Sequence, residues 1–131
     1  MATDHILASD DSAPAERCFA LDAVTAVIVT FNSAHCAEAL GAQLADWPHV
    51  IVVDNGSADD TPARIRAALP QAQVLELGEN RGFGAANNAA LHQVRTPFAL
   101  LMNPDCAVMA ADAQALLASM ADWPHAAIMA P

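Results

Sequence analysis

The sequence predicts an α/β domain with three layers, in which helices cover both faces of a mostly parallel sheet. Short, nearly continuous apolar runs predict strands that are buried on both faces. Segments of helical composition alternate with these runs, and such alternation is typical of right-handed βαβ units. The expected strands are Val24–Thr30, Val50–Val53, Val74–Leu77 and Phe98–Met102.

The segments between the expected strands complete this outline. We expect helices over Ala34–Ala45, Thr61–Leu69, Ala85–Val94 and Ala110–Ala121, and a fifth strand over Ala126–Ala130. The pentapeptide Ala-Asp-Trp-Pro-His occurs at Ala45–His49 and again at Ala121–His125. Each copy lies between an expected helix and an expected strand, so we interpret it as one type of turn used twice. Residues 1–22 lack periodicity, which predicts a flexible N-terminal arm before a single domain over residues 23–131.

The composition excludes several classes of protein. The chain is 55% hydrophobic and 15% charged, which is too apolar for a disordered protein. Its net charge of −10, with five arginines and no lysine, argues against a nucleic-acid-binding or anionic-membrane-binding protein. A phosphate group would have to be held by few arginines, by backbone N–H groups or by a metal ion.

The cysteines and the N-terminal residues bear on the cellular compartment. Cys18, Cys36 and Cys106 are odd in number and contain no CxxC pair, so we expect small core residues in a reducing setting. The N-terminal residues lack the apolar stretch of a signal peptide, and no run approaches the ~20 apolar residues of a membrane span. We therefore expect a cytoplasmic protein, which could also lie at the periphery of the inner membrane.

Polar residues follow each expected strand at its carboxyl end. Three clusters and one glycine-rich loop occupy these positions: Thr30-Phe31-Asn32-Ser33, Asp54-Asn55-Gly56-Ser57, Gly78–Gly84 and Asn103-Pro104-Asp105. The carboxyl ends of parallel strands meet at one edge of the sheet, where ligands bind in open α/β folds. The sequence therefore predicts a ligand site at this edge.

The residue types at this edge suit a nucleoside diphosphate. Asp54 is placed to accept hydrogen bonds from a ribose or a base. Asp105 could hold Mg²⁺ or Mn²⁺, which prefer oxygen ligands and bridge phosphates. Arg81 could pair with a phosphate or a base, and Gly82 and Gly84 would let the backbone approach the ligand.

Each part also has an ordinary structural interpretation. Asp54-Asn55-Gly56-Ser57 alone could be a simple turn, and Asp105 alone could cap a helix. Gly82-Phe83-Gly84 resembles the start of a dinucleotide fingerprint, but the last glycine is missing, which disfavours a nicotinamide-dependent oxidoreductase. The functional interpretation depends on all the parts occurring together, in order, at one edge.

Four motifs in register carry a resemblance to a known family. They are Val27–Ser33, Val52–Thr61, Glu79–Asn87 and Leu101–Asp105. Together they resemble the amino-terminal half of the family 2 glycosyltransferases, which are inverting enzymes of GT-A fold. The Asn-Arg-Gly-Phe-Gly and Asn-Pro-Asp variants are similar to the rhamnosyltransferase-type branch, which acts on bacterial polysaccharides and cell-wall glycans. The resemblance covers roughly residues 24–131.

The resemblance implies a role for each residue of the expected site. Thr30 and Phe31 would line the pocket for the nucleotide base, and Asp54 would hydrogen-bond the uracil or thymine ring. Arg81 would approach the base or the diphosphate. The other residues expected to bind the nucleotide sugar are Asn32, Asn55, Asn80, Gly82 and Gly84. Asn103 and Asp105 match the ends of the family's Asp-x-Asp motif: Asp105 would bind Mg²⁺ or Mn²⁺, and Asn103 would contact the ribose or support the metal through water. The donor would be a dTDP- or UDP-sugar, with dTDP-rhamnose as one candidate.

The resemblance also implies what these 131 residues lack. Members of the family continue into a second half that carries the acceptor site, for a glycan or lipid-linked acceptor, and the general base. Only Asp112 and Asp122 follow Asp105 as acidic residues, and neither replaces that base. The catalytic base is therefore unknown, and transfer by this chain alone is in doubt. The alternative is a non-catalytic nucleotide-binding or interaction module derived from the family. A sheet without its second half would expose an edge, so we expect a homo-oligomer or poor solubility.

Overall fold

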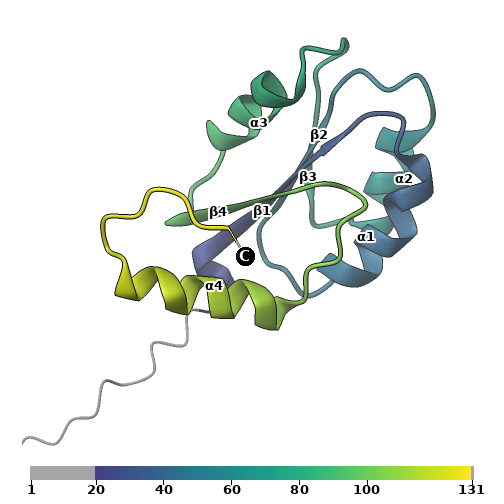
Figure 1. The fold of residues 1–131 in the computed structure, drawn as a ribbon. Helices are drawn as coiled ribbons and strands as arrows, with labels where there is room; N and C mark the ends of the chain where they lie inside the picture. Colours follow the sequence, from purple (N-terminus) through teal and green to yellow (C-terminus); the bar gives the residue numbers. More distant parts are fainter. Residues whose placement is uncertain (1–19, 131) are drawn as a thin grey trace, which may run out of the picture.

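The computed structural model describes residues 20–130 of the chain, and its centre is a sheet of four parallel strands (Figure 1). The strands are β1 (Val24–Thr30), β2 (Val50–Asp54), β3 (Gln73–Glu76) and β4 (Phe98–Met102). They lie in the order β3-β2-β1-β4. The first two strands are therefore central, and β3 and β4 are the edge strands of the described sheet. β1 and β2 are buried at every position because strands and helices surround them, as their continuous apolar runs predict.

The register of the sheet aligns the ends of the strands. Thr30, the last residue of β1, pairs with Asp54, the last residue of β2. Asp54 in turn pairs with Glu76, the last residue of β3, and Ile28 of β1 pairs with Met102 at the end of β4. The polar segments that follow the four strands therefore emerge along the same edge.

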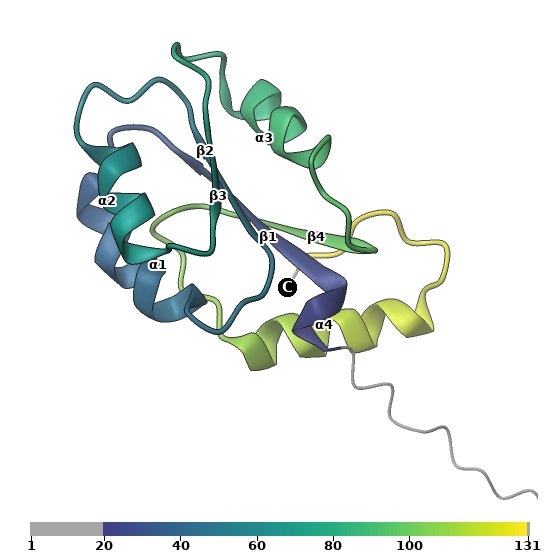
Figure 2. The ribbon, with the colours of Figure 1, turned by 180° about the vertical axis from the view of Figure 1, so that it is seen from behind.

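Helices cover the two faces of the sheet unequally (Figure 2). The helices are α1 (Ala37–Leu44), α2 (Thr61–Ala68), α3 (Phe83–Leu91) and α4 (Ala110–Asp122), and short 3-10 turns precede β1 and α1 at Leu21–Ala23 and Ala34–Cys36. One face packs against α1, α2 and α4, around Ile28, Leu40 and Leu117. Among the described helices, α3 alone packs against the other face, where Val27 and Val53 meet Ala86 and Ala90. The three-layer α/β prediction is confirmed.

The structure corrects several details of the predicted outline. Residues 126–130 contain no strand, so the expected fifth strand Ala126–Ala130 is wrong. The expected first helix opens with a 3-10 turn, and β3 lies one residue earlier than predicted. α3 begins at Phe83 rather than Ala85, because the positive φ of Gly82 (83°) ends the preceding loop. The expected N-terminal arm falls almost wholly outside the described residues.

The repeated pentapeptide adopts two different environments. Trp47 in the first copy is 2% exposed and packs into the core between α1 and β2. Trp123 in the second copy is 67% exposed and follows α4 without leading into a strand. The interpretation as one helix-to-strand turn used twice is therefore wrong. None of the described helices combines the length and apolarity that crossing a membrane requires.

Candidate functional site

Asp54 is the buried acidic group at the carboxyl edge of the sheet. It ends β2 and is 3% exposed. Its Oδ2 accepts a hydrogen bond from the Ser57 backbone N–H at 3.0 Å, and its Oδ1 accepts hydrogen bonds from the Ser57 and Thr30 hydroxyls. These bonds fix the carboxylate at the strand end. Asp54 thus lies under the surface of the edge, held by the loop that follows it and by the end of β1.

Asn32 joins the loop after β1 to the loop after β2. Its φ of 50° is in the left-handed region, which asparagine tolerates better than most residues. Its backbone N–H donates to the Ser57 hydroxyl at 2.9 Å, and its Oδ1 accepts the Ala58 N–H at 2.8 Å. The Asn32 side chain, one of those expected to bind the nucleotide sugar, therefore joins two loops, while the neighbouring Phe31 is 48% exposed.

A second connection between the same loops lies at the start of α2. The fully buried Thr61 hydroxyl accepts the Ser33 N–H at 2.9 Å and donates to Oδ1 of Asp59. This hydrogen bond from Thr61, together with bonds from the backbone N–H groups of Thr61 and Ala34, lowers the pKa of the exposed Asp59. The Asp59 carboxylate thus supports the loop after β1 from outside, in its charged form.

Asn55 joins the loop after β2 to the loop after β3. Its backbone N–H donates to the carbonyl of Thr30 at 2.8 Å. Its side chain accepts the Arg81 N–H at 2.9 Å and donates to Oδ1 of Asn80 at 3.1 Å. We call the three connected loops, residues 31–33, 55–60 and 77–82, the joined loops.

The Arg81 guanidinium is the positive charge on the joined loops that faces solvent. Its Nε lies 3.2 Å from Oε1 of Glu79, and both side chains are more than half exposed. Exposed ion pairs contribute little to stability, so another anion can replace Glu79 as the partner of Arg81 at a small cost in free energy. Of the two glycines assigned to the site, Gly82 has positive φ and ends the loop, whereas Gly84 lies inside the first turn of α3.

Asn103 and Asp105 follow β4 in a turn that the Cys106 N–H closes onto the carbonyl of Asn103 at 3.2 Å. No hydrogen bond within residues 20–130 connects this turn to the joined loops. Asp105 nevertheless lies close enough to the loop after β1 to act on Cys36: burial first, and then the negative charge of Asp105, raise the pKa of the Cys36 thiol. The structure thus places the metal candidate on the same edge.

The described residues fit a divalent cation only as a partial site. Asp105 is exposed, and its carboxylate makes no hydrogen bond or ion pair within residues 20–130. That part of the chain contains no group of three or more His, Cys, Asp or Glu side chains suited to a metal. Mg²⁺ and Mn²⁺ take one or two carboxylates and complete their coordination with water and substrate phosphates. One free carboxylate beside Asn103 suits that mode of binding and does not suit a closed protein cage.

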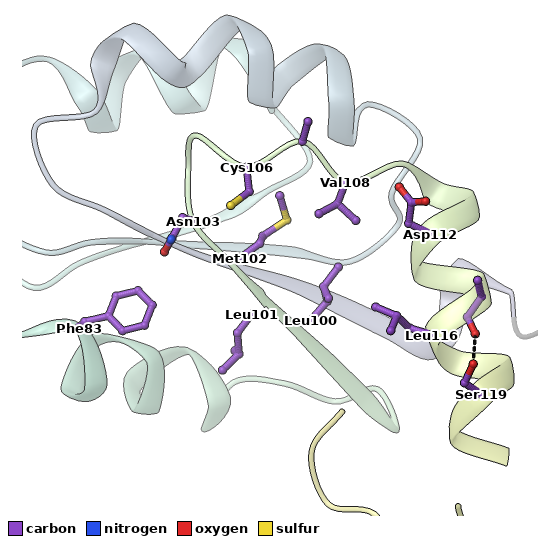
Figure 3. Close-up of a pocket in the computed structure, with 12 residues that line it drawn as sticks. Phe83, Leu100, Leu101, Met102, Asn103, Cys106, Val108, Asp112, Leu116 and Ser119 are labelled. Carbon is purple, nitrogen blue, oxygen red and sulfur yellow. Dashed lines mark hydrogen bonds between the residues drawn. The ribbon is translucent and has the colours of Figure 1, made fainter. Parts of the chain in front are cut away.

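A hollow of about 750 Å³ lies beside this turn and passes around β4 (Figure 3). Its apolar side chains include Leu100 and Leu101 of β4, Leu116 of α4, and Phe83 at the start of α3. Asn103 and Cys106 line it at the end nearest the turn. Cys106 is an exposed free thiol, so the prediction of a core residue is wrong there, whereas Cys36 is buried as expected.

Sequence reasoning left several residues of this edge without a role. Ser57 and Thr61 connect the loops. Thr61 follows Asp59 by two residues, the spacing of an Asx turn, which could have indicated its role, whereas Ser57 follows Asp54 by three residues. Phe83 is 55% exposed on the hollow, and no pattern in the sequence marks it as exposed.

Comparisons with known proteins agree with this architecture. Residues 25–131 match the model of the family described as glycosyl transferase family 2. The chain is 36% identical over 87 residues to the succinoglycan biosynthesis protein ExoO of Rhizobium meliloti, covering 63% of this chain and 25% of that protein. It is 29% identical over 93 residues to N-acetylglucosaminyl-diphospho-decaprenol L-rhamnosyltransferase of Mycobacterium tuberculosis, covering 63% and 30%.

A solved structure shares the fold. The mannosyltransferase PcManGT from Pyrobaculum calidifontis, in complex with GDP-Man and Mn²⁺, superposes with a TM-score of 0.64 at 27% sequence identity. The match covers 80% of this chain and 33% of that chain. The chain therefore spans about a quarter to a third of the length of these three proteins. Because the family match extends over most of its length, the chain belongs to glycosyl transferase family 2.

Proposed function

We propose that this chain binds a nucleoside-diphosphate sugar and forms the donor half of an inverting glycosyltransferase of polysaccharide or cell-wall glycan synthesis. The observation that carries the proposal is the common edge: the buried Asp54, the solvent-facing Arg81 and the unpaired Asp105 all follow parallel strands at their carboxyl ends. The relatives act in succinoglycan biosynthesis and rhamnosyl transfer, which supports the same class of reaction.

The burial of these residues separates those that would contact the ligand from those that would support them from beneath. Phe31 and Arg81 face solvent, so they would contact the base and the diphosphate directly. Thr30 is fully buried and Asp54 and Asn55 nearly so, so they would act from beneath, with Asp54 offering its remaining lone pairs to the base. Asn103 and Asp105 would hold Mg²⁺ or Mn²⁺. When bound there, a divalent ion offsets the negative charge of the leaving diphosphate.

The donor is the finer part of this proposal. The resemblance to the rhamnosyltransferase branch favours a dTDP- or UDP-sugar, with dTDP-rhamnose as one candidate, and one relative is named as an L-rhamnosyltransferase. The mannosyltransferase neighbour was solved with GDP-Man and Mn²⁺. Titration of the full chain with UDP, dTDP and GDP, each with Mn²⁺, Mg²⁺ or a chelator, separates these donors and metals. We expect one nucleotide to bind with Kd below about 1 mM, and binding to weaken in chelator.

Two variants make the titration specific to the metal candidate. Asp105→Asn should weaken metal-dependent binding at least about tenfold, since even an outer-sphere partner of a metal contributes that much. Asp46→Asn is the matched control, because Asp46 is equally exposed but follows α1 at the opposite edge of the sheet. No binding of any nucleotide at millimolar concentration, or equal losses in both variants, would contradict the proposal.

The second candidate function is a binding module without transferase activity. The observation in its favour is the position of the acidic residues after Asp105: Asp112 caps α4 by accepting the Met109 N–H at 2.9 Å, and Asp122 ends the same helix. Asp112 lines the hollow beside the turn after β4, but its carboxylate is engaged in the helix cap, and Asp122 lies at the other end of α4. Release of free sugar from the donor, or its transfer to a glycan or lipid-linked acceptor, by the 131-residue chain alone would exclude this candidate.

A further inference from the structure

The side-chain amide of Asn55 connects β2 to the loop that carries Arg81. Asn55 is 4% exposed, and its backbone is fixed by the hydrogen bond to the Thr30 carbonyl. The Arg81 N–H can only donate, so Asn55 must direct its Oδ1 to Arg81 and its Nδ2 to Asn80. The orientation of the Asn55 amide is thus determined by its partners.

Asn80 receives two donors on one oxygen. Its Oδ1 accepts Asn55 Nδ2 at 3.1 Å and the Gly82 N–H at 2.9 Å. The chain of bonds therefore runs from buried β2 through Asn55 and Asn80 to Gly82, the residue that precedes α3. Arg81 lies between the two fixed points.

Gly56 provides an independent observation that the two loops are in contact. A Cβ added to Gly56 would lie 2.5 Å from the carbonyl carbon of Glu79 and 2.7 Å from the backbone nitrogen of Asn80. Its φ of +81° also favours glycine. The backbones of the two loops are therefore packed directly on each other, beside the hydrogen bonds of Asn55.

We propose that Asn55 and Asn80 are positioning residues whose amide pair holds the Arg81 loop in its binding conformation before any ligand arrives. The proposal rests on the proposed function for the role of Arg81, but the amide pair itself is a property of the ligand-free chain. The backbone of Arg81 is fixed, while its exposed guanidinium makes an ion pair with Glu79 and a long hydrogen bond from Nη2 to the Leu77 carbonyl at 3.4 Å. Both contacts are exposed, so a phosphate can replace them at a small cost in free energy. A loop ordered in advance binds more tightly because less entropy is lost on binding.

The geometry makes an asymmetric prediction for the same chemical change at the two asparagines. Asn80→Asp keeps the oxygen that accepts from Asn55 and Gly82, so the pair remains intact. Asn55→Asp replaces the donor Nδ2 with an oxygen that faces Asn80 Oδ1. Asn80 must then turn its amide to donate, which removes the acceptor of the Gly82 N–H.

The primary experiment is residue-by-residue amide hydrogen exchange of the ligand-free chain by NMR. We expect Gly82 exchange to accelerate about tenfold in Asn55→Asp, the equivalent of one hydrogen bond, and to change little in Asn80→Asp. Asn80→Ala, at an exposed position that tolerates truncation, should accelerate both Arg81 and Gly82 if Asn55→Asp fails to fold. Asn88→Asp on the exposed surface of α3 is the matched control. Equal Gly82 exchange in Asn80→Ala, Asn80→Asp and the unsubstituted chain would overturn the proposal.

Nucleotide titration of the same variants separates this proposal from the proposed function. If both hold, Asn80→Ala weakens nucleotide binding about tenfold in parallel with the faster exchange, and Asn88→Asp does not. If the unsubstituted chain binds no nucleotide while Asn80→Ala still exchanges faster than Asn80→Asp, the proposed function is wrong and the amide pair stands. If nucleotide binds and Asn80→Ala leaves both exchange and affinity unchanged, the amide pair has no positioning role.

Discussion

The joined loops and the β4 side of the molecule, which we define as β4, residues 103–109 and α4, differ in how they are held. The side chains of Asn32, Asn55 and Thr61 accept hydrogen bonds from backbone N–H groups of neighbouring loops and so connect the joined loops. On the β4 side, the turn after β4 closes with a backbone bond to Asn103, and Asp112 caps α4 from within the helix. Side-chain hydrogen bonds therefore connect the joined loops to one another, whereas the β4 side is held by the ladder between β4 and β1, by local bonds and by the apolar core.

The same difference is visible in burial along one row of the sheet. Val27 of β1 and Leu101 of β4 are partners in register and lie on the same face, yet Val27 is 0% exposed and Leu101 is 48% exposed. α3 covers Val27 together with β2, and it leaves Leu101 open to the hollow (Figure 3). Within residues 20–130, β4 pairs with β1 alone and is an edge strand. α3 thus covers this face of the sheet at β1, whereas the β4 side presents apolar surface.

Gly56→Ala should break the joined loops with the largest effect. The added Cβ meets the backbone of Glu79 and Asn80, and the residue must keep a positive φ. We expect a loss of about 3 kcal/mol in the free energy of unfolding, from backbone strain and overpacking together. Urea unfolding followed by circular dichroism measures it.

Two other glycines separate the causes of that loss. Gly78→Ala introduces strain at φ +74° with no atom within 4 Å, so it should cost about 1 kcal/mol. Gly84→Ala lies in α3 with open space around it and should stabilise by about 0.5–1 kcal/mol. Similar losses for Gly56→Ala and Gly78→Ala would show that the two backbones are not in close contact.

Thr61→Val tests the connection at the start of α2. It keeps the shape of the side chain but leaves the buried Ser33 N–H without its acceptor and removes the donor to Asp59. We expect a loss of about 2 kcal/mol in the free energy of unfolding. Thr61→Ser restores the hydroxyl and should recover most of the loss in the same urea experiment. A Thr61→Val chain as stable as the original would show that this connection is dispensable.

Leu101→Lys tests the β4 side. We expect the chain to self-associate through β4, because an apolar edge strand is a template for pairing with a second copy. Removing a half-exposed leucine from such a contact, worth about 1.4 kcal/mol, should raise the dissociation constant about tenfold. Leu91→Lys adds the same charge on α3, 40% exposed, and should change less. A chain that sediments as a monomer at every concentration would contradict the expectation.

The fold was largely predictable because its strands are buried on both faces. Val24–Thr30 and Phe98–Met102 were predicted to the residue, since continuous β-branched and apolar runs between turn residues have few other solutions. The segment 126–130 has the same apolar composition but no strand partner, and it stays irregular. Pairing partners are long-range contacts that a local pattern does not contain. The two Trp-Pro-His copies also show that a local pattern does not determine burial, because neighbouring elements cover Trp47 and leave Trp123 exposed.

The edge that carries the candidate site followed from topology, but the roles of its residues did not. A parallel sheet places Thr30, Asp54 and Asp105 at one edge whatever their contacts. Whether an asparagine faces a ligand or another loop depends on partners that are distant in sequence, as Asn55 and Asn80 show. The assignment of these residues to a nucleotide-sugar site therefore stays a prediction, now with a division between exposed and supporting side chains.

Acidification should have the smallest effect on the free energy of unfolding, and it should weaken the joined loops before the β4 side. The hydrogen bonds from Thr61 and from the Ala34 backbone lower the pKa of Asp59 below its ordinary value. A carboxylate with a depressed folded-state pKa stabilises the fold above its unfolded-state pKa, and this contribution is lost as the pH falls through the folded-state pKa.

We therefore expect Asp59→Asn to make the acid-side decline of the urea midpoint shallower between about pH 5 and pH 2. Asp46→Asn, at an exposed carboxylate that makes no hydrogen bond or ion pair in the described part of the chain, should leave the slope unchanged. Identical slopes for Asp59→Asn and the unsubstituted chain would show that Asp59 does not brace the loop after β1.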